Sequence, residues 1–152
     1  MEEIDVIDRR IIRILQEDAS LSVAAIGEAA GLSQNACWRR IKRLEDSGVL
    51  KSRVAIFDAE RLGHPLTVFA ILRVKDHSEK WFEAFAKKMT AMPEVVEFYR
   101  MSGEIDYMAK IVARDIKHYD EIYKRIIGFG PIQDVSSSFA MEAIKCTTTV
   151  PV

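Results

Sequence analysis

The residues best suited to a chemical task lie in a short basic segment near the amino end of the chain. Four of the five positions in Arg39–Arg43 are cationic, and no acidic residue follows until Glu45. Arg can bridge O6 and N7 of guanine, and Asn or Gln can bridge N6 and N7 of adenine. Lys and flanking Arg residues suit phosphates, which position a protein on DNA without reading its sequence. The candidate DNA-contacting residues in and around this segment are Ser33, Gln34, Asn35, Trp38, Arg39, Arg40, Lys42 and Arg43.

A basic helix face also has a simpler interpretation. Cations near the carboxyl end of a helix are favoured by the helix dipole, so Arg39–Arg43 would form a solvated surface without any partner. Trp38 lies on the same face, and an indole is costly to leave in water. Trp38 is therefore expected to pack on the first helix, to pack on a second copy of the chain, or to contact the DNA backbone. The elements around this segment help to decide between these interpretations.

Three short helices are expected to position the basic surface, because apolar residues recur at helical spacing and capping residues separate the runs. The first helix is predicted over Ile4–Asp18, the second is capped by Ser20 or Ser22 and ended by Gly31, and the third runs from Ser33 to about Ser47 and is ended by Gly48.

Small residues indicate how the second and third helices cross. Gly27 lies where the crossing would occur, Gly31 follows in the turn, and Leu32 can fill the space between the helices. The third helix has an apolar stripe on the side opposite the basic face, formed by Cys37, Ile41 and Leu44. This combination predicts a helix-turn-helix, whose second helix can lie in the major groove of DNA. We therefore favour DNA binding over a solvated surface.

After Gly48 the pattern changes to that of an α/β segment. Val49–Asp58 alternates like a strand, and Ala59–Pro65 contains breakers typical of a linker. The expected elements that follow are strands at Thr67–Val74, Val95–Met101 and Tyr107–Val112, helices at Ser78–Met92 and Ile116–Ile127, and a mostly extended segment at Ile132–Thr149. This order is that of the ferredoxin-like βαββαβ unit.

The fold class is therefore predicted to be α+β, with a winged helix-turn-helix of three helices plus short strands and a ferredoxin-like domain. We expect a DNA-binding domain at residues 1–50, a connecting strand and linker at 51–64, and a ligand-sensing and oligomerisation domain at 65–152.

Composition limits the function classes. The chain has 152 residues and a net charge of −1, so DNA binding has to depend on a local basic patch. Cys37 and Cys146 lack the spacing of metal ligands, so neither a metal nor a cofactor is expected. Met1–Leu15 lacks a signal peptide, and Leu66–Leu72 is too short to span a bilayer. A cytoplasmic protein without a membrane partner is expected.

Four segments of the sequence resemble the Lrp/AsnC family of transcriptional regulators, also called leucine-responsive or feast/famine regulators. They are Asp5–Leu15 (DVIDRRIIRIL), Leu32–Leu50 (LSQNACWRRIKRLEDSGVL), Ser102–Tyr107 (SGEIDY) and Phe139–Lys145 (FAMEAIK). The resemblance covers nearly the whole chain. Two departures are Ala36, where many members have Pro, and Glu104, which is often Asp.

The resemblance implies that the carboxyl-terminal domain dimerises through its sheet, that dimers assemble further, often to octamers, and that a small-molecule effector, usually an amino acid, binds between dimers near Ser102–Tyr107. An α-amino acid needs an anion for its ammonium group and donors for its carboxylate. Asp106 is the first candidate for the anion and Glu104 the second. The expected effector-binding residues are Met101, Gly103, Glu104, Asp106, Tyr107, Ser136, Ser137 and Ser138.

Each of these effector assignments has an alternative. Gly103 and Asp106 are also common in plain β-hairpin turns. The hydroxyls of Ser136–Ser138 could offer donors or form the exposed face of a strand. Met101 and Tyr107 are equally suited to a pocket wall and to a hydrophobic core.

Two other functions remain open. Sirohaem decarboxylases have a similar architecture, but their chemistry would require His residues, and His64, His77 and His118 are expected in linkers or at helix starts. The common nucleotide-loop, nucleophile-elbow and zinc-protease motifs are absent from the sequence, so we expect no enzyme. An architectural protein that wraps DNA with little sequence preference is the third possibility.

Overall fold

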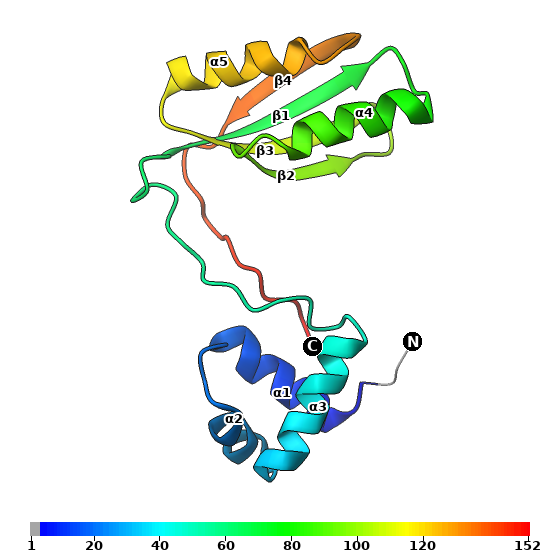
Figure 1. Cartoon of the computed structure of the whole chain (residues 1–152). Coiled ribbons are helices and arrows are strands. Elements are labelled where there is room, and N and C mark those ends of the chain that lie inside the picture. Colours follow the sequence, from blue (N-terminus) through cyan, green and yellow to red (C-terminus); the bar gives the residue numbers. More distant parts are fainter. Residues whose placement is uncertain (1–3) are drawn as a thin grey trace. The chain divides into compact units, whose positions relative to one another are not determined.

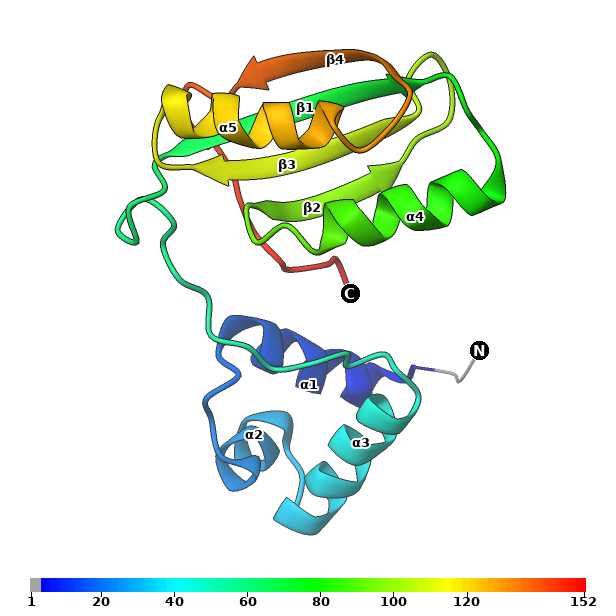
Figure 2. The same cartoon turned by 45° about the horizontal axis from the view of Figure 1, so that its top comes forward.

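The computed structural model describes residues 4–152, so the first three residues of the expected domain 1–50 lie outside the described part. The chain divides into two compact units (Figures 1 and 2). One contains the described residues up to Ile56 together with Lys145–Val152, and the other contains Phe57–Ile144. The division into domains 1–50, 51–64 and 65–152 stays a prediction. The structure groups Lys145–Val152 with the first unit.

Three helices make up most of the first unit, as the sequence predicts. They are α1 (Val6–Glu17), α2 (Val23–Ala30) and α3 (Gln34–Asp46). Asp5, Ser22 and Ser33 cap their amino ends through side-chain oxygens that accept backbone N–H groups. Gly31 ends α2 with a φ of 75°, a conformation that is cheap only for glycine.

The crossing of α2 and α3 depends on the absence of a side chain at Gly27. A Cβ atom there would lie 3.1 Å from the carbonyl oxygen of Leu32 and 3.3 Å from Cβ of Cys37. The helices pack around a small apolar core that contains Ile11, Leu15, Ile26, Ala30, Cys37, Ile41 and Leu44. The helix-turn-helix expected from the sequence is therefore formed.

The first turn of α1 is held by two aspartates. The carboxylate of Asp5 accepts the N–H of Asp8 at 2.8 Å, and the carboxylate of Asp8 accepts the N–H of Asp5 at 3.1 Å. This reciprocal pair is a capping box. The N–H of Asp8 and the guanidinium of Arg40 lower the pKa of Asp5 to about 2.

The last residues of the described chain pack against α1. The side-chain amide of Gln16 donates to the carbonyl oxygen of Val150 at 3.1 Å and accepts the N–H of Val150 at 2.7 Å. Nε and Nη2 of Arg13 donate to the carbonyl oxygen of Val152 at 3.1 and 2.8 Å. The chain thus leaves the first unit after Ile56 and returns to it at Lys145.

The strand expected at Val49–Asp58 is wrong for this structure. Residues 51–58 have no regular secondary structure, and no strand pairs with them in the described part of the chain. Val54, Ile56 and Phe57 are 73–76% exposed. A strand needs a neighbouring ladder for its N–H and C=O groups, which an alternating sequence cannot supply by itself. The short strands of the expected wing are therefore missing, and the final strand ends at Phe139 instead of continuing toward Thr149.

The second unit is a four-stranded antiparallel sheet with two helices on one face (Figure 2). In chain order its elements are β1 (Leu66–Val74), α4 (Glu79–Thr90), β2 (Val95–Arg100), β3 (Tyr107–Ala113), α5 (Ile116–Ile127) and β4 (Ile132–Phe139). The strand order is β2-β3-β1-β4. This confirms the ferredoxin-like βαββαβ prediction.

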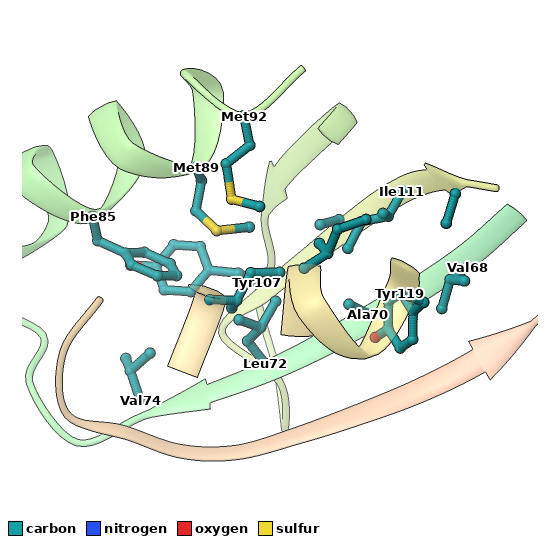
Figure 3. Packing of buried hydrophobic residues seen from close by; sticks show 14 residues of the cluster. Val68, Ala70, Leu72, Val74, Phe85, Met89, Met92, Tyr107, Ile111 and Tyr119 are labelled. Atoms are coloured by element: carbon teal, nitrogen blue, oxygen red, sulfur yellow. The ribbon is translucent and has the colours of Figure 1, made fainter. Parts of the chain in front are cut away.

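Alternate residues of β1 and β3 form the core beneath the helices (Figure 3). Val68, Ala70 and Leu72 of β1 are fully buried there, together with Phe85 and Met89 of α4. The opposite face of the sheet carries apolar side chains that are only half-buried, among them Phe69, Ile71, Met108 and Val112. One face of the sheet is thus covered by helices, while the other has apolar side chains on β1 and β3 that no element of its own unit covers.

Replacing Gly27 with Val should destabilise the first unit by about 1–3 kcal/mol, because the added side chain would crowd the carbonyl oxygen of Leu32 and Cβ of Cys37. The measurement is urea unfolding followed by circular dichroism. Ala29→Val is the matched control, since Ala29 is exposed on the same helix. Equal stabilities of the two variants would contradict the close crossing at Gly27.

Asp5 should contribute a pH-dependent part of the stability. Because its pKa falls from 3.8 to about 2 on folding, the contribution is complete above about pH 4 and is lost as the pH falls to about 2. Asp5→Asn keeps a capping oxygen but cannot titrate. The wild type should therefore lose more stability than Asp5→Asn between these pH values in parallel unfolding curves, and identical losses would exclude this role.

Candidate nucleic-acid interface

The outer face of α3 carries the residues expected to contact DNA. Gln34, Asn35 and Arg39 are exposed, and Trp38 is 55% exposed. An open depression runs along this helix and is lined by Trp38, Arg39, Lys42, Arg43, Asp46 and Ser47. The structure therefore brings amides, an indole and cations together on one accessible surface, while Cys37 and Ile41 face the core.

Trp38 does not pack into the helical core of its own unit. The partly buried residues around that core include neighbours from α1 and α2, and Trp38 is not among them. Trp38 is 55% exposed, so its packing on the first helix or on a second copy, or its contact with DNA, stays a prediction. Ser33, at the start of α3, uses its hydroxyl to accept the N–H of Ala36 at 3.3 Å, so this oxygen is engaged as a cap.

The cations of α3 differ in how they are paired. Nη1 of Arg40 lies 2.7 Å from Oδ2 of Asp5 and 2.8 Å from Oδ1 of Asp8. Arg43 forms an ion pair with the other oxygen of Asp8. These contacts connect α3 to α1, so the two arginines expected at phosphates have carboxylate partners in the same chain.

The other two cations of α3, Lys42 and Arg39, differ from each other in their ion pairs. Lys42 pairs with Asp46 one turn further along α3, with 2.8 Å between Nζ and Oδ1. This contact raises the pKa of Lys42. Arg39 makes no ion pair with the part of the chain that the structure describes. Arg39 is consequently the cation of this helix that is best placed to meet a base edge.

Sequence reasoning missed the partners Asp5 and Asp8. They precede Arg40 by 35 and 32 residues, so no local spacing connects them. The signal available was the pair of acids at the start of the first helix, which indicates capping but not a contact with the third helix.

The expected effector residues fall into three places. Met101, Gly103, Glu104 and Asp106 belong to the loop between β2 and β3, where Gly103 has a φ of 110° and the N–H of Met101 donates to the carbonyl oxygen of Asp106 at 2.8 Å. This loop is accessible, since Gly103 and Glu104 are exposed.

Asp106 has a structural task in this loop. Its Oδ2 accepts the N–H of Val74 at 2.8 Å, and its own N–H donates to the carbonyl oxygen of Leu72 at 3.0 Å. Its Oδ1 faces the imidazole of His77 at 3.7 Å. One carboxylate oxygen therefore closes the end of β1, and the other points toward a mostly exposed histidine.

Tyr107 and Ser137 lie on the helix-covered face of the sheet. Tyr107 is 3% exposed, its ring stacks on Phe82 and Phe98, and this burial raises its pKa. The hydroxyl of Ser137 forms a 2.6 Å hydrogen bond with that of Tyr119. Neither residue shares an open surface with the β2–β3 loop.

Ser136 and Ser138 are exposed on the other face, opposite Ile71 and Phe69 of β1 in the register of the sheet. The structure thus separates the eight expected effector residues between a loop, the core and the open face of the sheet.

Two of the three histidines lie near each other: the ring centroids of His64 and His118 are 6.5 Å apart, while His77 faces Asp106. His118 lies in the first turn of α5, where Nδ1 accepts the N–H of Arg114 at 3.2 Å and Nε2 faces Glu94 at 3.7 Å. The described residues contain no cluster of His, Cys, Asp and Glu that could hold a metal ion. None of the helices at residues 4–152 has the length and apolar character that a bilayer crossing requires.

Comparison with known families agrees with both halves of the structure. The model of the AsnC-type helix-turn-helix domain matches residues 4–45, and the model of the Lrp/AsnC ligand binding domain matches residues 67–150. Together these two models account for most of the chain.

Known proteins are similar over nearly their whole length. The DNA-binding transcriptional activator DecR of Escherichia coli (strain K12) is 46% identical over 150 residues, which are 98% of this chain and 99% of DecR. An AsnC family transcriptional regulator from Agrobacterium tumefaciens has 49% identity and a TM-score of 0.93, covering 97% of this chain and 96% of that one.

A third match was solved with a ligand. The complex of a transcriptional regulator from Neisseria meningitidis with L-Met has 29% identity and a TM-score of 0.92, and covers 98% of this chain and 97% of that chain. The helix-turn-helix, the ferredoxin-like sheet and these matches lead to one conclusion: the chain belongs to the Lrp/AsnC family of DNA-binding transcriptional regulators.

Proposed function

We propose that two copies of this chain pair through the open faces of their sheets and place two α3 helices in successive major grooves of a pseudo-palindromic operator. The observation that carries the proposal is the exposed outer face of α3, with Gln34, Asn35, Trp38 and Arg39 together on a helix-turn-helix. Two-fold symmetry would set the helices about one DNA turn apart, roughly 34 Å.

The open face of the sheet supports the pairing. Phe69, Ile71, Met108 and Val112 lie there on β1 and β3, half-buried and without a covering helix in their unit. Apolar surface of this kind is stabilised by burial against a partner. Further assembly of dimers, up to an octamer, would bring several weak contacts onto one DNA and raise the effective concentration of each.

The β2–β3 loop is the proposed effector site. The similar regulator of Neisseria meningitidis was solved with L-Met, which supports an amino acid as the effector class. In this chain Glu104 is exposed, and Asp106 keeps one oxygen for which no hydrogen bond is formed by the described residues. These carboxylates can receive an ammonium group, and the N–H groups near Gly103 can receive a carboxylate. The effector acts only through its different affinities for two assemblies.

We infer a regulatory role without enzymatic activity. The relatives are named transcriptional regulators. The alternative as a sirohaem decarboxylase would need histidines free to act on a tetrapyrrole, whereas the ring nitrogens of His118, which lies beside His64, face the N–H of Arg114 and the carboxylate of Glu94. A Soret band in the purified protein would revive that alternative.

Arg39→Ala should weaken binding to a duplex selected from a random pool by about 1–3 kcal/mol if Arg39 reads a base. The measurement is fluorescence anisotropy on the selected duplex and on a mixed-sequence duplex at the same salt concentration. The loss should be larger on the selected duplex. An equal loss on both would make Arg39 a phosphate contact, and equal wild-type affinities for both would favour an architectural, DNA-wrapping protein.

The assembly should respond to an amino acid. Size-exclusion chromatography with light scattering, on the protein alone and with each of the twenty amino acids, should show a mass that changes with at least one of them. A dimer or octamer whose mass none of them changes would contradict amino-acid control of assembly and leave the DNA-binding proposal intact.

A further inference from the structure

We propose that Asp8, assisted by Asp5, limits the sequence-independent DNA affinity of this regulator by keeping Arg40 and Arg43 paired within the chain and away from the phosphate backbone. The inference rests on the proposed function, because it assumes that α3 is the DNA-contacting helix. It assigns control of nonspecific binding to Asp5 and Asp8, which need not touch DNA themselves.

Asp8 is a charged residue held entirely inside the unit. Its side chain is 0% exposed, and its two oxygens face Arg40 and Arg43 on α3. Oδ2 also accepts the N–H of Asp5. Asp5 adds a second carboxylate to Arg40 at 2.7 Å. Two guanidinium groups thus meet two carboxylates, and their charges compensate each other within the chain.

Arg40 and Arg43 lie beside the residues proposed to contact bases. Arg43 lines the same depression as Trp38, Arg39 and Lys42, and its side chain is 42% exposed. The side chain of Arg40 is 26% exposed. Both are long and flexible, so without a carboxylate partner each could extend toward a phosphate near the helix. Lys42 is restrained in a similar way by Asp46.

This pairing bears on nonspecific binding because phosphate contacts strengthen binding to every sequence. Binding to mixed-sequence DNA consists almost wholly of such contacts, so it weakens when cations are paired within the chain. The pairing of Arg40 and Arg43 with carboxylates lowers the affinity for nonspecific DNA. It leaves Arg39, Gln34 and Asn35 free to contact bases. The basic sequence at Arg39–Arg43 therefore overstates the positive charge that DNA would meet.

A purely structural role for Asp8 predicts the opposite effect on nonspecific binding. If the carboxylate only held α3 against α1, neutralising it would loosen the helix and weaken binding to all DNA. If it withholds arginines, neutralising it would strengthen binding to mixed-sequence DNA and make that binding more salt-dependent. The sign of the change distinguishes the two roles.

The test compares Asp8→Asn with the wild type on a mixed-sequence duplex over a range of salt concentrations. Asn has the shape of Asp and keeps an acceptor, but it lacks the charge. Each released arginine that reaches a phosphate should steepen the slope of log K against log salt by about 0.9, so the expected change is up to about 1.8. The affinity for the mixed-sequence duplex at low salt should rise.

Glu17→Gln is the matched control. It changes the net charge by the same amount, and Glu17 is exposed at the end of α1 with no ion pair to an arginine in the described structure. An Asp8→Asn slope equal to that of Glu17→Gln, or weaker binding to the mixed-sequence duplex by a variant with native circular dichroism, would overturn the proposal.

Asp5→Asn keeps the proposal testable if Asp8→Asn fails to fold. Asp5 is exposed, and its loss frees only part of the restraint on Arg40. Its slope should steepen by no more than about 0.9, and a slope unchanged from Glu17→Gln would count against the proposal. Failure of the wild type to bind either the selected or the mixed-sequence duplex would instead refute the proposed function.

Discussion

The described part of the first unit depends on the buried carboxylate of Asp8. A carboxylate without solvent is tolerated only when its oxygens are fully bonded, and Asp8 meets this condition with Arg40, Arg43 and the N–H of Asp5. The amino end of α1 and the middle of α3 are therefore fixed to each other by charge as well as by apolar packing. Such a contact has directional requirements that the apolar core lacks, so it defines how α3 is oriented on α1.

The second unit is organised by a different constraint. Its sheet buries alternate residues of β1 and β3 under α4 and α5, and the side chains between them point to the open face. Phe69 and Ile71 are apolar on that face, although a solvated strand would carry polar residues there. The same alternation that builds the core thus creates a surface suited to a second copy of the chain.

Much of this could be predicted from local patterns. Helices with clear caps, such as those started by Ser22 and Ser33, appear where the sequence places them, because a cap and a following apolar stripe act within a few residues. The strand expected at Val49–Asp58 did not form, since alternation indicates a face to bury and cannot identify a partner strand. The end of β4 was missed for the same reason.

The candidate sites show the same limit. Arg39 and Trp38 were correctly placed on an exposed face by helical periodicity, whereas the pairing of Arg40 and Arg43 with Asp8 spans more than thirty residues and leaves no trace in local spacing. Tyr107 and Ser137 carry suitable chemical groups, but the two-residue repeat of a strand turns both toward the core. Residue types suggested which side chains could bind an effector, and the register of the sheet determined which of them are accessible.

The return of the chain to α1 has a consequence for how the protein tolerates cleavage. Because Gln16 and Arg13 hold the backbone of Val150 and Val152, the DNA-binding helices have two connections to the sheet: the covalent chain through Ile56, and the segment from Lys145, which hydrogen bonds hold on α1. A protease that cuts the exposed segment around Val54 would sever one of them and leave the other anchored by hydrogen bonds. The nicked molecule would stay together as a complex of two fragments.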